Sequence, residues 1–340
     1  ALAAVPLWLA PKPDRSWTAP GIVLLALAAW SAIQAIPLPL AVLAKIAPAN
    51  ADVWARSLLP LGEHPTWGSL SLDPGASLVE AVKWLTYACT FLAASTMAMR
   101  RGPAFVLALV FGSATLTAIV TLLHGMASAT KVFGIYQPAG AFAPNHLGPL
   151  LNANTLAGYL TLGAICGLGL VLMRRSLLPR WLAVVGVAVD IGAIVRSGSR
   201  GGVAALLIGV VVLAGLGWKT SARSSSFKHR AVPFALVGGT VVFGGALALL
   251  GGTGSIWRDL LSDNVAKLKI VTWTVPLLRT YTWLGVGRGA FESVFEAYRP
   301  ALRAHVIYTH PENFPAQWAS EWGVVVALIA VGGGAAFWRR

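Results

Sequence analysis

Long apolar runs alternate with short polar segments along most of this chain. Eight of the runs approach the length of about 20 residues that a helix needs to cross a hydrocarbon core about 30 Å thick. Because lipid offers the backbone no hydrogen-bond partner, and because the runs are too long for the strands of a barrel, we expect each run to form a helix. The predicted spans cover residues 21–37, 77–99, 103–123, 147–173, 181–196, 201–218, 232–251 and 316–338.

The composition agrees with a polytopic membrane protein. Hydrophobic residues make up 56% of the 340 residues and charged residues 11%, whereas a soluble domain carries about 25% charged residues. The formal net charge of +14 would suggest a nucleic-acid partner in a soluble chain, but here the positive-inside rule accounts for it, and we expect no nucleic-acid binding. The predicted fold class is therefore an all-α, multi-helix transmembrane bundle.

The basic residues orient the predicted helices. With eight spans, all five basic clusters fall on one side of the membrane, which must be the cytoplasm; they are Lys12 with Arg15, Arg100 with Arg101, Arg174 and Arg175 with Arg180, Lys219 through Arg230, and Arg339 with Arg340. The opposite side receives three loops, at residues 38–76, 124–146 and 252–315. We predict a bundle of seven spans in residues 1–251, a large periplasmic catalytic loop in residues 252–315 and a last transmembrane helix in residues 316–340. The apolar residues 1–10 have no basic region before them and are expected to be the tail of an earlier helix, not a signal peptide.

A short polar segment, RSGSRGGV, separates two of the most apolar runs. From Trp181 to Arg200 the chain has 20 residues, which as a helix rise roughly 30 Å. Arg200 is therefore predicted at the outer edge of the hydrocarbon, at the depth of the lipid phosphates. A guanidinium at this place matches the bidentate geometry of a phosphate, although it could also extend to lipid headgroups.

Small residues surround this arginine. Ser199 and Gly201 allow a tight turn, and the next helix is expected to begin near Gly201, so that its N-terminal amides and dipole favour an anion. For the neighbouring Arg196 we prefer a structural interpretation, an ion pair with Asp190. For Arg200 we prefer the anion site.

The end of the third outer loop carries a second group of polar residues. His310 precedes the last predicted span, and Glu312, Asn313 and Glu321 follow it. A histidine near neutral pKa can act as a base on a sugar hydroxyl, although a single histidine is often structural. Seven basic residues in this loop face five acids, which fits anion binding or a solvated, salt-bridged loop. The aromatic residues Trp273, Tyr281 and Trp283 fit two interpretations, an interfacial belt and a sugar-stacking platform.

The sequence contains no pattern typical of a metal or nucleotide site. The six histidines are scattered without ligand spacing, and Cys89 and Cys166 lie inside apolar runs. A paired acidic motif, a P-loop and a nucleophilic-serine elbow are also missing. We therefore expect chemistry that uses no metal and no cofactor.

Five motifs together resemble the O-antigen ligase and O-antigen polymerase superfamily of bacterial envelopes. They are WGSLSLDPGAS in the first outer loop, GAFAPNHLGPLLNANTLAGYL at the entry to the fourth span, SGSRGG at the head of the sixth, LGVGRGAF in the third outer loop, and HPEN with the following Gln-Trp, Glu and Gly at the last span. Each motif is weak alone, but their order and their common outer side make the match fairly specific. The resemblance extends over nearly the whole chain.

The resemblance implies a GT-C-like glycosyltransferase, independent of metal and nucleotide, in the bacterial inner membrane. Such an enzyme takes a glycan from undecaprenyl diphosphate at the periplasmic face and transfers it to an acceptor hydroxyl. A ligase uses the lipid A core, a polymerase uses another repeat unit, and a protein O-oligosaccharyltransferase uses a Ser or Thr side chain. We expect a ligase, with the donor, the acceptor glycan or lipid A core, and membrane lipid as partners.

The same resemblance implies roles for individual residues. His310 corresponds to the family's catalytic histidine, and Glu312 could share the role of base. Arg200 would hold the diphosphate with a second cation, for which Lys269 occupies the place of the family's arginine four residues before Trp273. The substitutes for that cation are Arg258 and Arg288, and the supporting residues are Ser199, Gly201, Asn313 and Glu321.

Two rival functions come from other classes of protein. A polysaccharide transporter or flippase should carry an ionisable group near the middle of the bilayer, and Asp190 is the candidate in this sequence. In a non-catalytic envelope assembly protein, His310 and Arg200 would be dispensable.

The orientation of the helices gives a first prediction. A reporter fused within the basic segment from Lys219 to Arg230 should be cytoplasmic, because this segment has four basic residues and no acid. Alkaline phosphatase fused there should be inactive and green fluorescent protein should be fluorescent, with the opposite pattern for fusions in residues 124–146. Periplasmic activity of a fusion at Lys219–Arg230 would contradict the placement of every candidate site residue.

Overall fold

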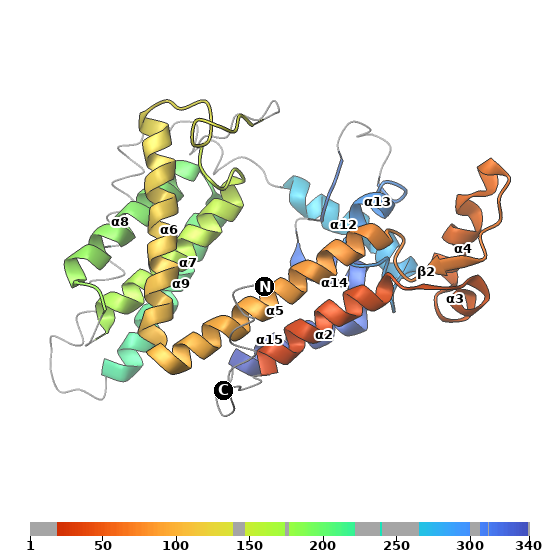
Figure 1. The fold of residues 1–340 in the computed structure, drawn as a ribbon, viewed down its shortest axis with the longest axis horizontal. Helices are drawn as coiled ribbons and strands as arrows, with labels where there is room; N and C mark the ends of the chain where they lie inside the picture. Colours follow the sequence, from red (N-terminus) through yellow and green to blue (C-terminus); the bar gives the residue numbers. More distant parts are fainter. Residues whose placement is uncertain are drawn as a thin grey trace. The chain divides into compact units, whose positions relative to one another are not determined.

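A computed structural model describes residues 19–138, 147–173, 177–221, 239, 265–299, 307–311 and 313–338. Within these ranges, the side chains of residues 217–221, 265–269 and 335–338 are not described. The chain divides into two compact units. The first unit combines Ala1–Thr96 with Asp263–Arg340, and the second is Met97–Ser262 (Figure 1).

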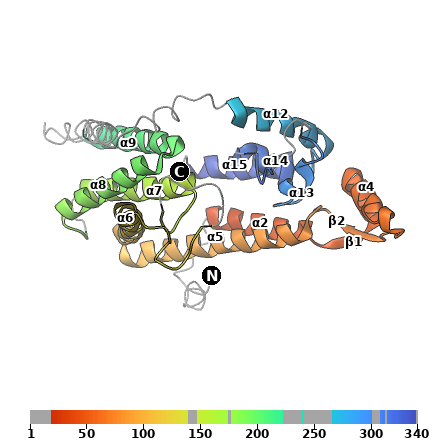
Figure 2. The same ribbon diagram turned by 90° about the horizontal axis from the view of Figure 1, so that it is seen from above.

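The first unit brings the two ends of the chain together. Its helix α2, Ala19–Gln34, lies beside α5, Pro74–Arg101, in both views (Figure 1, Figure 2). Two glycines lie at these helix contacts: an added Cβ at Gly21 would lie 3.3 Å from Leu92, and one at Gly333 would lie 3.4 Å from Val23, an ordinary contact distance. Helix α2 therefore packs against both α5 and α15, Val324–Trp338. The shared apolar core consists of Leu27, Ala28, Trp84, Trp322 and Ala330.

The first predicted outer loop is a folded substructure of this unit. Strands β1, Pro37–Pro39, and β2, Trp67–Ser69, pair antiparallel with Pro37 opposite Ser69. Between them lie α3, Leu40–Ile46, α4, Pro48–Ser57, and the short 3-10 helix η2, Leu59–Leu61. The Trp54 indole N–H donates to the Ser69 carbonyl at 3.0 Å. A Cβ at Gly68 would come within 2.7 Å of the Trp54 ring, so this strand position requires glycine.

The third predicted outer loop, residues 252–315, contains further helices of the first unit. Helix α12, Val265–Thr280, and the short α13, Phe291–Phe295, precede α14, Phe314–Trp322. The rings of Phe291 and Phe295 are fully buried and stacked at 4.6 Å between centroids. The described part of this loop therefore contains two helices and a buried apolar cluster of Ile270, Phe291 and Phe295.

The second unit is a helical bundle around α7. Helices α6, Pro103–Met126, α8, Arg180–Ser197, and α9, Arg200–Ser221, each contact α7, Ala153–Leu172 (Figure 1). Small residues let these backbones approach, as is common in membrane bundles. A Cβ at Gly163 would lie 2.2 Å from Ala114, and one at Gly167 would lie 2.6 Å from Phe111.

Most of the predicted spans correspond to helices of the structure. The described part of the chain is mostly helical and consistent with a helical membrane protein, in which α6 and α7 are long and apolar enough to cross a membrane. Shorter apolar helices are present at Ala19–Gln34, Arg200–Leu216 and Val324–Gly334. Almost all of the predicted span 232–251 lies outside the described residues. The total of eight spans and the three predicted regions stay predictions.

The last predicted span, residues 316–338, is not one helix. It is divided at Gly323 into α14 and α15, so the prediction of a continuous helix is wrong. Gly323 has a φ of 86°, and a Cβ there would lie 2.0 Å from the Trp283 carbonyl oxygen. The helix is interrupted because another backbone segment lies against it at this residue.

The close packing of α7 gives a second prediction. Gly167→Ala should lower the thermal unfolding midpoint in detergent, because the new methyl group meets Phe111 and Val187 within 2.7 Å, and overpacking costs about 1–3 kcal/mol. Gly169→Ala is the matched control on the same helix, where nothing lies within 4 Å of the new Cβ. The control should be neutral or slightly stabilising, by up to about 1 kcal/mol. Equal midpoints for the two variants would contradict the described packing.

Candidate functional site

The glycine-rich turn of residues 284–289 joins three segments of the first unit, and we call this meeting point the junction. The Val286 N–H donates to the Ser320 carbonyl at 2.9 Å, and the Gly287 N–H donates to the Glu321 carbonyl at 3.1 Å. On its other side, the Val286 carbonyl accepts from the Leu72 N–H at 2.8 Å. The turn therefore joins two of the sequence motifs, WGSLSLDPGAS and the segment that enters the last predicted span.

Two glycines of this turn are required by the space available. Gly285 and Gly287 have φ values of 71° and 101°, which side chains with a Cβ rarely adopt. A Cβ at Gly285 would lie 2.4 Å from the Glu321 carbonyl oxygen, and one at Gly287 would lie 2.2 Å from the Ser71 hydroxyl. Gly285 and Gly287 of the LGVGRGAF motif thus allow close contact with neighbouring segments.

Buried amide side chains complete the junction. The Gln34 Nε2 donates to the carbonyls of Leu284 at 2.9 Å and Glu321 at 3.0 Å, while its Oε1 accepts from the Arg288 N–H at 3.1 Å. The Asn50 Nδ2 donates to the Gly285 carbonyl at 3.1 Å. Each amide satisfies backbone groups that would otherwise be buried without a partner.

The WGSLSLDPGAS motif positions the start of α5 beside this turn. Asp73 precedes Pro74, and its Oδ1 accepts from the Ala76 N–H at 3.0 Å, as expected for an aspartate that begins a helix. The Ser77 hydroxyl lies 2.7 Å from both the Arg288 carbonyl and the Ser71 hydroxyl. The first turn of α5 is therefore bound directly to residue 288.

Arg288 lies between two carboxylates. Its Nη2 is 2.9 Å from the Glu80 Oε2 on α5, and its Nη1 forms an ion pair with the Glu321 Oε2 on α14. The guanidinium carbon lies 5.2 Å from the centre of the Trp322 ring. Arg288 is only 9% exposed. Glu80 also pairs with the exposed Lys83 at 2.7 Å, so that two cations balance two carboxylates.

Helix α14 connects this ion pair with the predicted catalytic histidine. Asn313 begins the helix, since its Oδ1 accepts from the Ala316 N–H at 2.9 Å. Gln317 lies one turn further and donates to the Glu321 Oε1 at 3.4 Å. His310, three residues before Asn313, is exposed, and its Nδ1 lies 2.7 Å from the Thr309 hydroxyl. The ion pair thus lies near the C-terminal end of α14, and His310 lies in the segment before its N-terminal end.

Arg200 begins α9 in the second unit. The preceding helix α8 ends at Ser197, and Gly198 has a φ of 70°. The Ser199 hydroxyl accepts from the Gly202 N–H at 3.1 Å and donates to the Asn154 Oδ1 at 2.7 Å. These contacts confirm the predicted helix start near Gly201, a residue with open space around its Cβ position. Arg200 and His310 belong to different units.

The predicted ion pair between Arg196 and Asp190 is wrong. Among the residues that the structure describes, Asp190 has no ion pair; it accepts from the Thr115 hydroxyl at 3.4 Å and is fully buried. Arg196 is exposed. Six residues on a helix correspond to about 9 Å of rise and about 240° of rotation, so the two side chains leave α8 in different directions.

The aromatic residues of the third outer loop differ in their surroundings. Tyr281 is buried in a core with Leu277, Val286 and Ala290, so neither an interfacial belt nor a sugar platform describes it. Burial, together with neighbouring Tyr298, raises the pKa of the Tyr281 phenol, which stays neutral. Trp273 packs edge-on against Tyr308, whereas Trp283 is 71% exposed.

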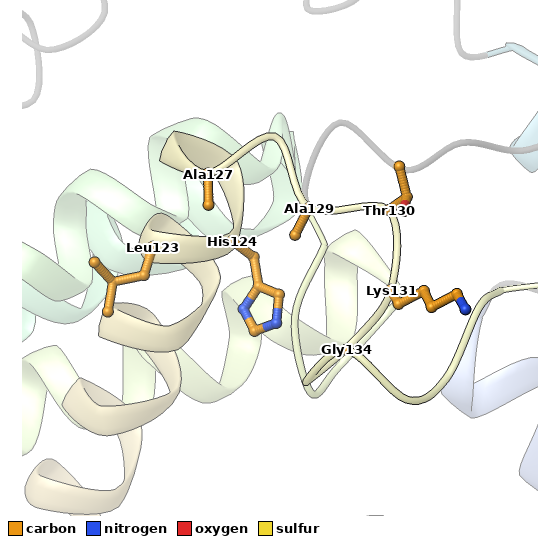
Figure 3. A pocket seen from close by; sticks show the side chains of 7 residues that line it. All are labelled: Leu123, His124, Ala127, Ala129, Thr130, Lys131 and Gly134. Atoms are coloured by element: carbon orange, nitrogen blue, oxygen red, sulfur yellow. The ribbon is translucent and has the colours of Figure 1, made fainter.

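A pocket at the end of α6 contains another histidine (Figure 3). It is lined by Leu123, His124, Ala127, Ala129, Thr130, Lys131 and Gly134. The His124 Nε2 accepts from the Phe133 N–H at 2.9 Å, and its Nδ1 lies 2.7 Å from the Val120 carbonyl. Both ring nitrogens are engaged by the backbone, so this histidine holds the loop after α6 and is not placed to act as a base.

Three predicted site residues receive no side-chain description. Lys269 lies in α12 without a described side chain, and Arg258 and Glu312 lie outside the described residues. Within the described ranges, no group of three His, Cys, Asp or Glu residues could hold a metal ion. The proposed roles of the site residues therefore stay predictions.

Sequence reasoning named Glu321 as a supporting residue but missed two other polar residues around Arg288, Gln34 and Glu80. Gln34 and Glu80 lie inside the predicted spans 21–37 and 77–99, where a polar or ionisable side chain is costly. This cost could have indicated that Gln34 and Glu80 are buried and paired, because polar residues in apolar runs usually are. Their partner was not predictable, since it lies far away in the sequence.

The fold and the junction define a mostly helical, membrane-type protein with a polar centre built from both ends of the chain. Residues 185–331 match the family model described as O-antigen ligase. Over these residues the match confirms the resemblance to the O-antigen ligase superfamily, a glycosyltransferase-like family of enzymes. It includes Arg200, the turn of residues 284–289, and α14. A search of the curated proteins and a search of the solved structures each found no match.

The turn gives a third prediction. Gly287→Ala should destabilise the protein strongly, because it combines a positive φ with a Cβ at 2.2 Å from the Ser71 hydroxyl. Gly62→Ala is the matched control, since Gly62 has a φ of 74° but nothing within 4 Å of its Cβ position. The control should cost about 1–2 kcal/mol for backbone strain, and Gly287→Ala about 1–3 kcal/mol more. Thermal unfolding in detergent measures both, and equal losses would contradict the close contact.

Proposed function

We propose that this protein is an O-antigen ligase-like glycosyltransferase. It takes a glycan from undecaprenyl diphosphate and transfers it to an acceptor hydroxyl, with the lipid A core as the acceptor, at the periplasmic face of the inner membrane. The observation that carries the proposal is the family match over residues 185–331, which includes both the Arg200 turn and the segment from His310 through α14.

The proposed reaction needs a base and a stabilised leaving group. The acceptor oxygen attacks the anomeric carbon while the bond from that carbon to the diphosphate oxygen breaks. The hydroxyl proton passes to His310, with Glu312 as a second candidate base, and the leaving diphosphate takes the electron pair of the broken bond. Fixed cations stabilise the charge that develops on the diphosphate, and no proton donor is needed there.

The surroundings of Arg200 support its role as the main diphosphate ligand. Arg200 is the first residue of a 22-residue helix, whose N-terminal amides and dipole favour an anion. Ser199 uses one of these amides, and the open space at Gly201 lets a phosphate approach the backbone. Lys269 and Arg258 are the additional cations of this proposal.

The alternatives differ from the ligase in ways that an assay can separate. An O-antigen or exopolysaccharide polymerase and a protein O-oligosaccharyltransferase share the lipid-linked donor and differ in the acceptor. A polysaccharide transporter or flippase is supported by Asp190, whose Oδ1 is buried without a hydrogen-bond partner in the part of the chain that the structure describes. Only the transferases form a new glycosidic bond.

Reconstitution gives the fourth prediction. Proteoliposomes with undecaprenyl-diphosphate-linked glycan and lipid A core should form the glycosylated product, detected by mass spectrometry. His310→Ala should lower kcat by about 10²- to 10⁴-fold. Arg200→Ala should raise the donor KM roughly 10- to 150-fold, since charge-assisted hydrogen bonds contribute about 1.5–3 kcal/mol.

The matched controls replace one histidine and one arginine outside the proposed site. His64→Ala and Arg279→Ala alter exposed residues and should transfer at the wild-type rate. Wild-type transfer by both His310→Ala and Arg200→Ala would contradict the proposed roles. Movement of the lipid-linked glycan across the membrane without transfer would favour the flippase.

A further inference from the structure

We propose that Arg288 is a positioning residue, which holds α14 through Glu321 and thereby places the His310 segment, and that it is not a ligand of the diphosphate. This inference rests on the proposed function, because it assigns a task to residues around the proposed base. It replaces the diphosphate role that the sequence suggested for Arg288.

The first argument is the charge around the guanidinium. Arg288 is already paired with Glu80 and Glu321, and Lys83 balances the remaining carboxylate charge. A diphosphate at this place would have to displace a carboxylate or lie beside two of them. The guanidinium is also buried against the Trp322 ring. Each terminal nitrogen of the guanidinium is therefore engaged by a different carboxylate within the protein.

The second argument is the place of Glu321 on α14. Glu321 is 1% exposed, and both its side chain and its backbone carbonyl are bound, the side chain to Arg288 and the carbonyl to Gly287 and Gln34. This end of α14 is thus fixed in position and in rotation about its axis. Asn313, at the other end, is eight residues away, or about 12 Å along the helix.

The third argument is the contrast between the two ends of α14. Trp322 is fully buried at the ion-paired end, whereas Phe314 is 73% exposed and His310 is exposed at the other end. If the ion pair of Glu321 with Arg288 were lost, α14 could rotate about its axis. The segment before α14, which carries His310, would then be displaced. A displacement of about 1 Å can lower a rate about 10²-fold, because the reacting atoms lose alignment.

The two carboxylates provide a matched pair of variants. Glu321→Gln and Glu80→Gln each remove one negative charge from the same guanidinium, but only Glu321 lies on α14. In the folded, monodisperse protein, Glu321→Gln should lower kcat about 10- to 100-fold and leave the donor KM within twofold of wild type. Glu80→Gln should lower kcat less. Arg288→Lys, which keeps the charge and loses the two separate nitrogens that bridge Glu80 and Glu321, should resemble Glu321→Gln.

The outcomes separate positioning from the other roles of Arg288. A donor KM raised by Arg288→Lys to the extent seen for Arg200→Ala would identify a diphosphate ligand and overturn the proposal. If Glu321→Gln and Glu80→Gln lower kcat equally, and a lower folded fraction explains the loss, the cluster is purely structural. This result would also overturn the proposal. If Glu321→Gln does not fold, Glu321→Asp keeps the charge, shortens the side chain and replaces it in the comparison.

A readout that needs no activity distinguishes this inference from the proposed function. A spin label at Phe314→Cys, with Cys89 and Cys166 replaced by alanine, reports the mobility of the histidine-bearing end of α14. Its spectrum should show greater mobility with Glu321→Gln and little change with Glu80→Gln. Absence of glycan transfer by the wild type would contradict the proposed function alone, whereas unchanged mobility with Glu321→Gln would contradict the positioning role alone.

Discussion

The backbone of residues 285–287 lies against the backbone of residues 320–323 at distances that only glycine allows. Three hydrogen bonds fix this contact and its extension to Leu72. Because the contact joins segments from both ends of the chain, α2, α5 and α14 of the first unit all depend on it. A side chain at Gly285 or Gly287 would separate these segments, and the buried amides of Gln34 and Asn50 would then lose their carbonyl partners.

Buried charge gives this junction specificity. An arginine between two carboxylates is costly to desolvate, and such a cluster is poor evidence for stability in itself. Its geometry nevertheless excludes alternatives, since Arg288 can satisfy Glu80 and Glu321 together only when α5 and α14 are in one arrangement. Removal of one partner leaves charge without compensation in a mostly apolar environment. The ion pairs therefore select one packing of these helices.

Arg200 and Arg288 both lie at glycine-containing turns in this chain, and their surroundings differ. Arg200 begins a long helix, where amides and dipole add to its positive charge. Arg288 is surrounded by carboxylates that cancel its charge. In the sequence, Arg200 of SGSRGG is the preferred diphosphate ligand, and Arg288 of LGVGRGAF is a substitute for the second cation. The contacts show that Arg288 is held between two carboxylates inside the protein, which no local pattern in the sequence indicated.

The sequence by itself determined the features that depend on a few neighbouring residues. Apolar runs predicted most of the helices, the small residues around Arg200 predicted the start of α9, and the motifs together predicted the resemblance that the family match supports over residues 185–331. Tertiary structure alone decided the partners of Arg288, the isolation of Asp190 from Arg196 and the break at Gly323. Helix propensity and capping act within one or two turns, whereas these three features depend on which distant segments pack together, and no local pattern specifies that.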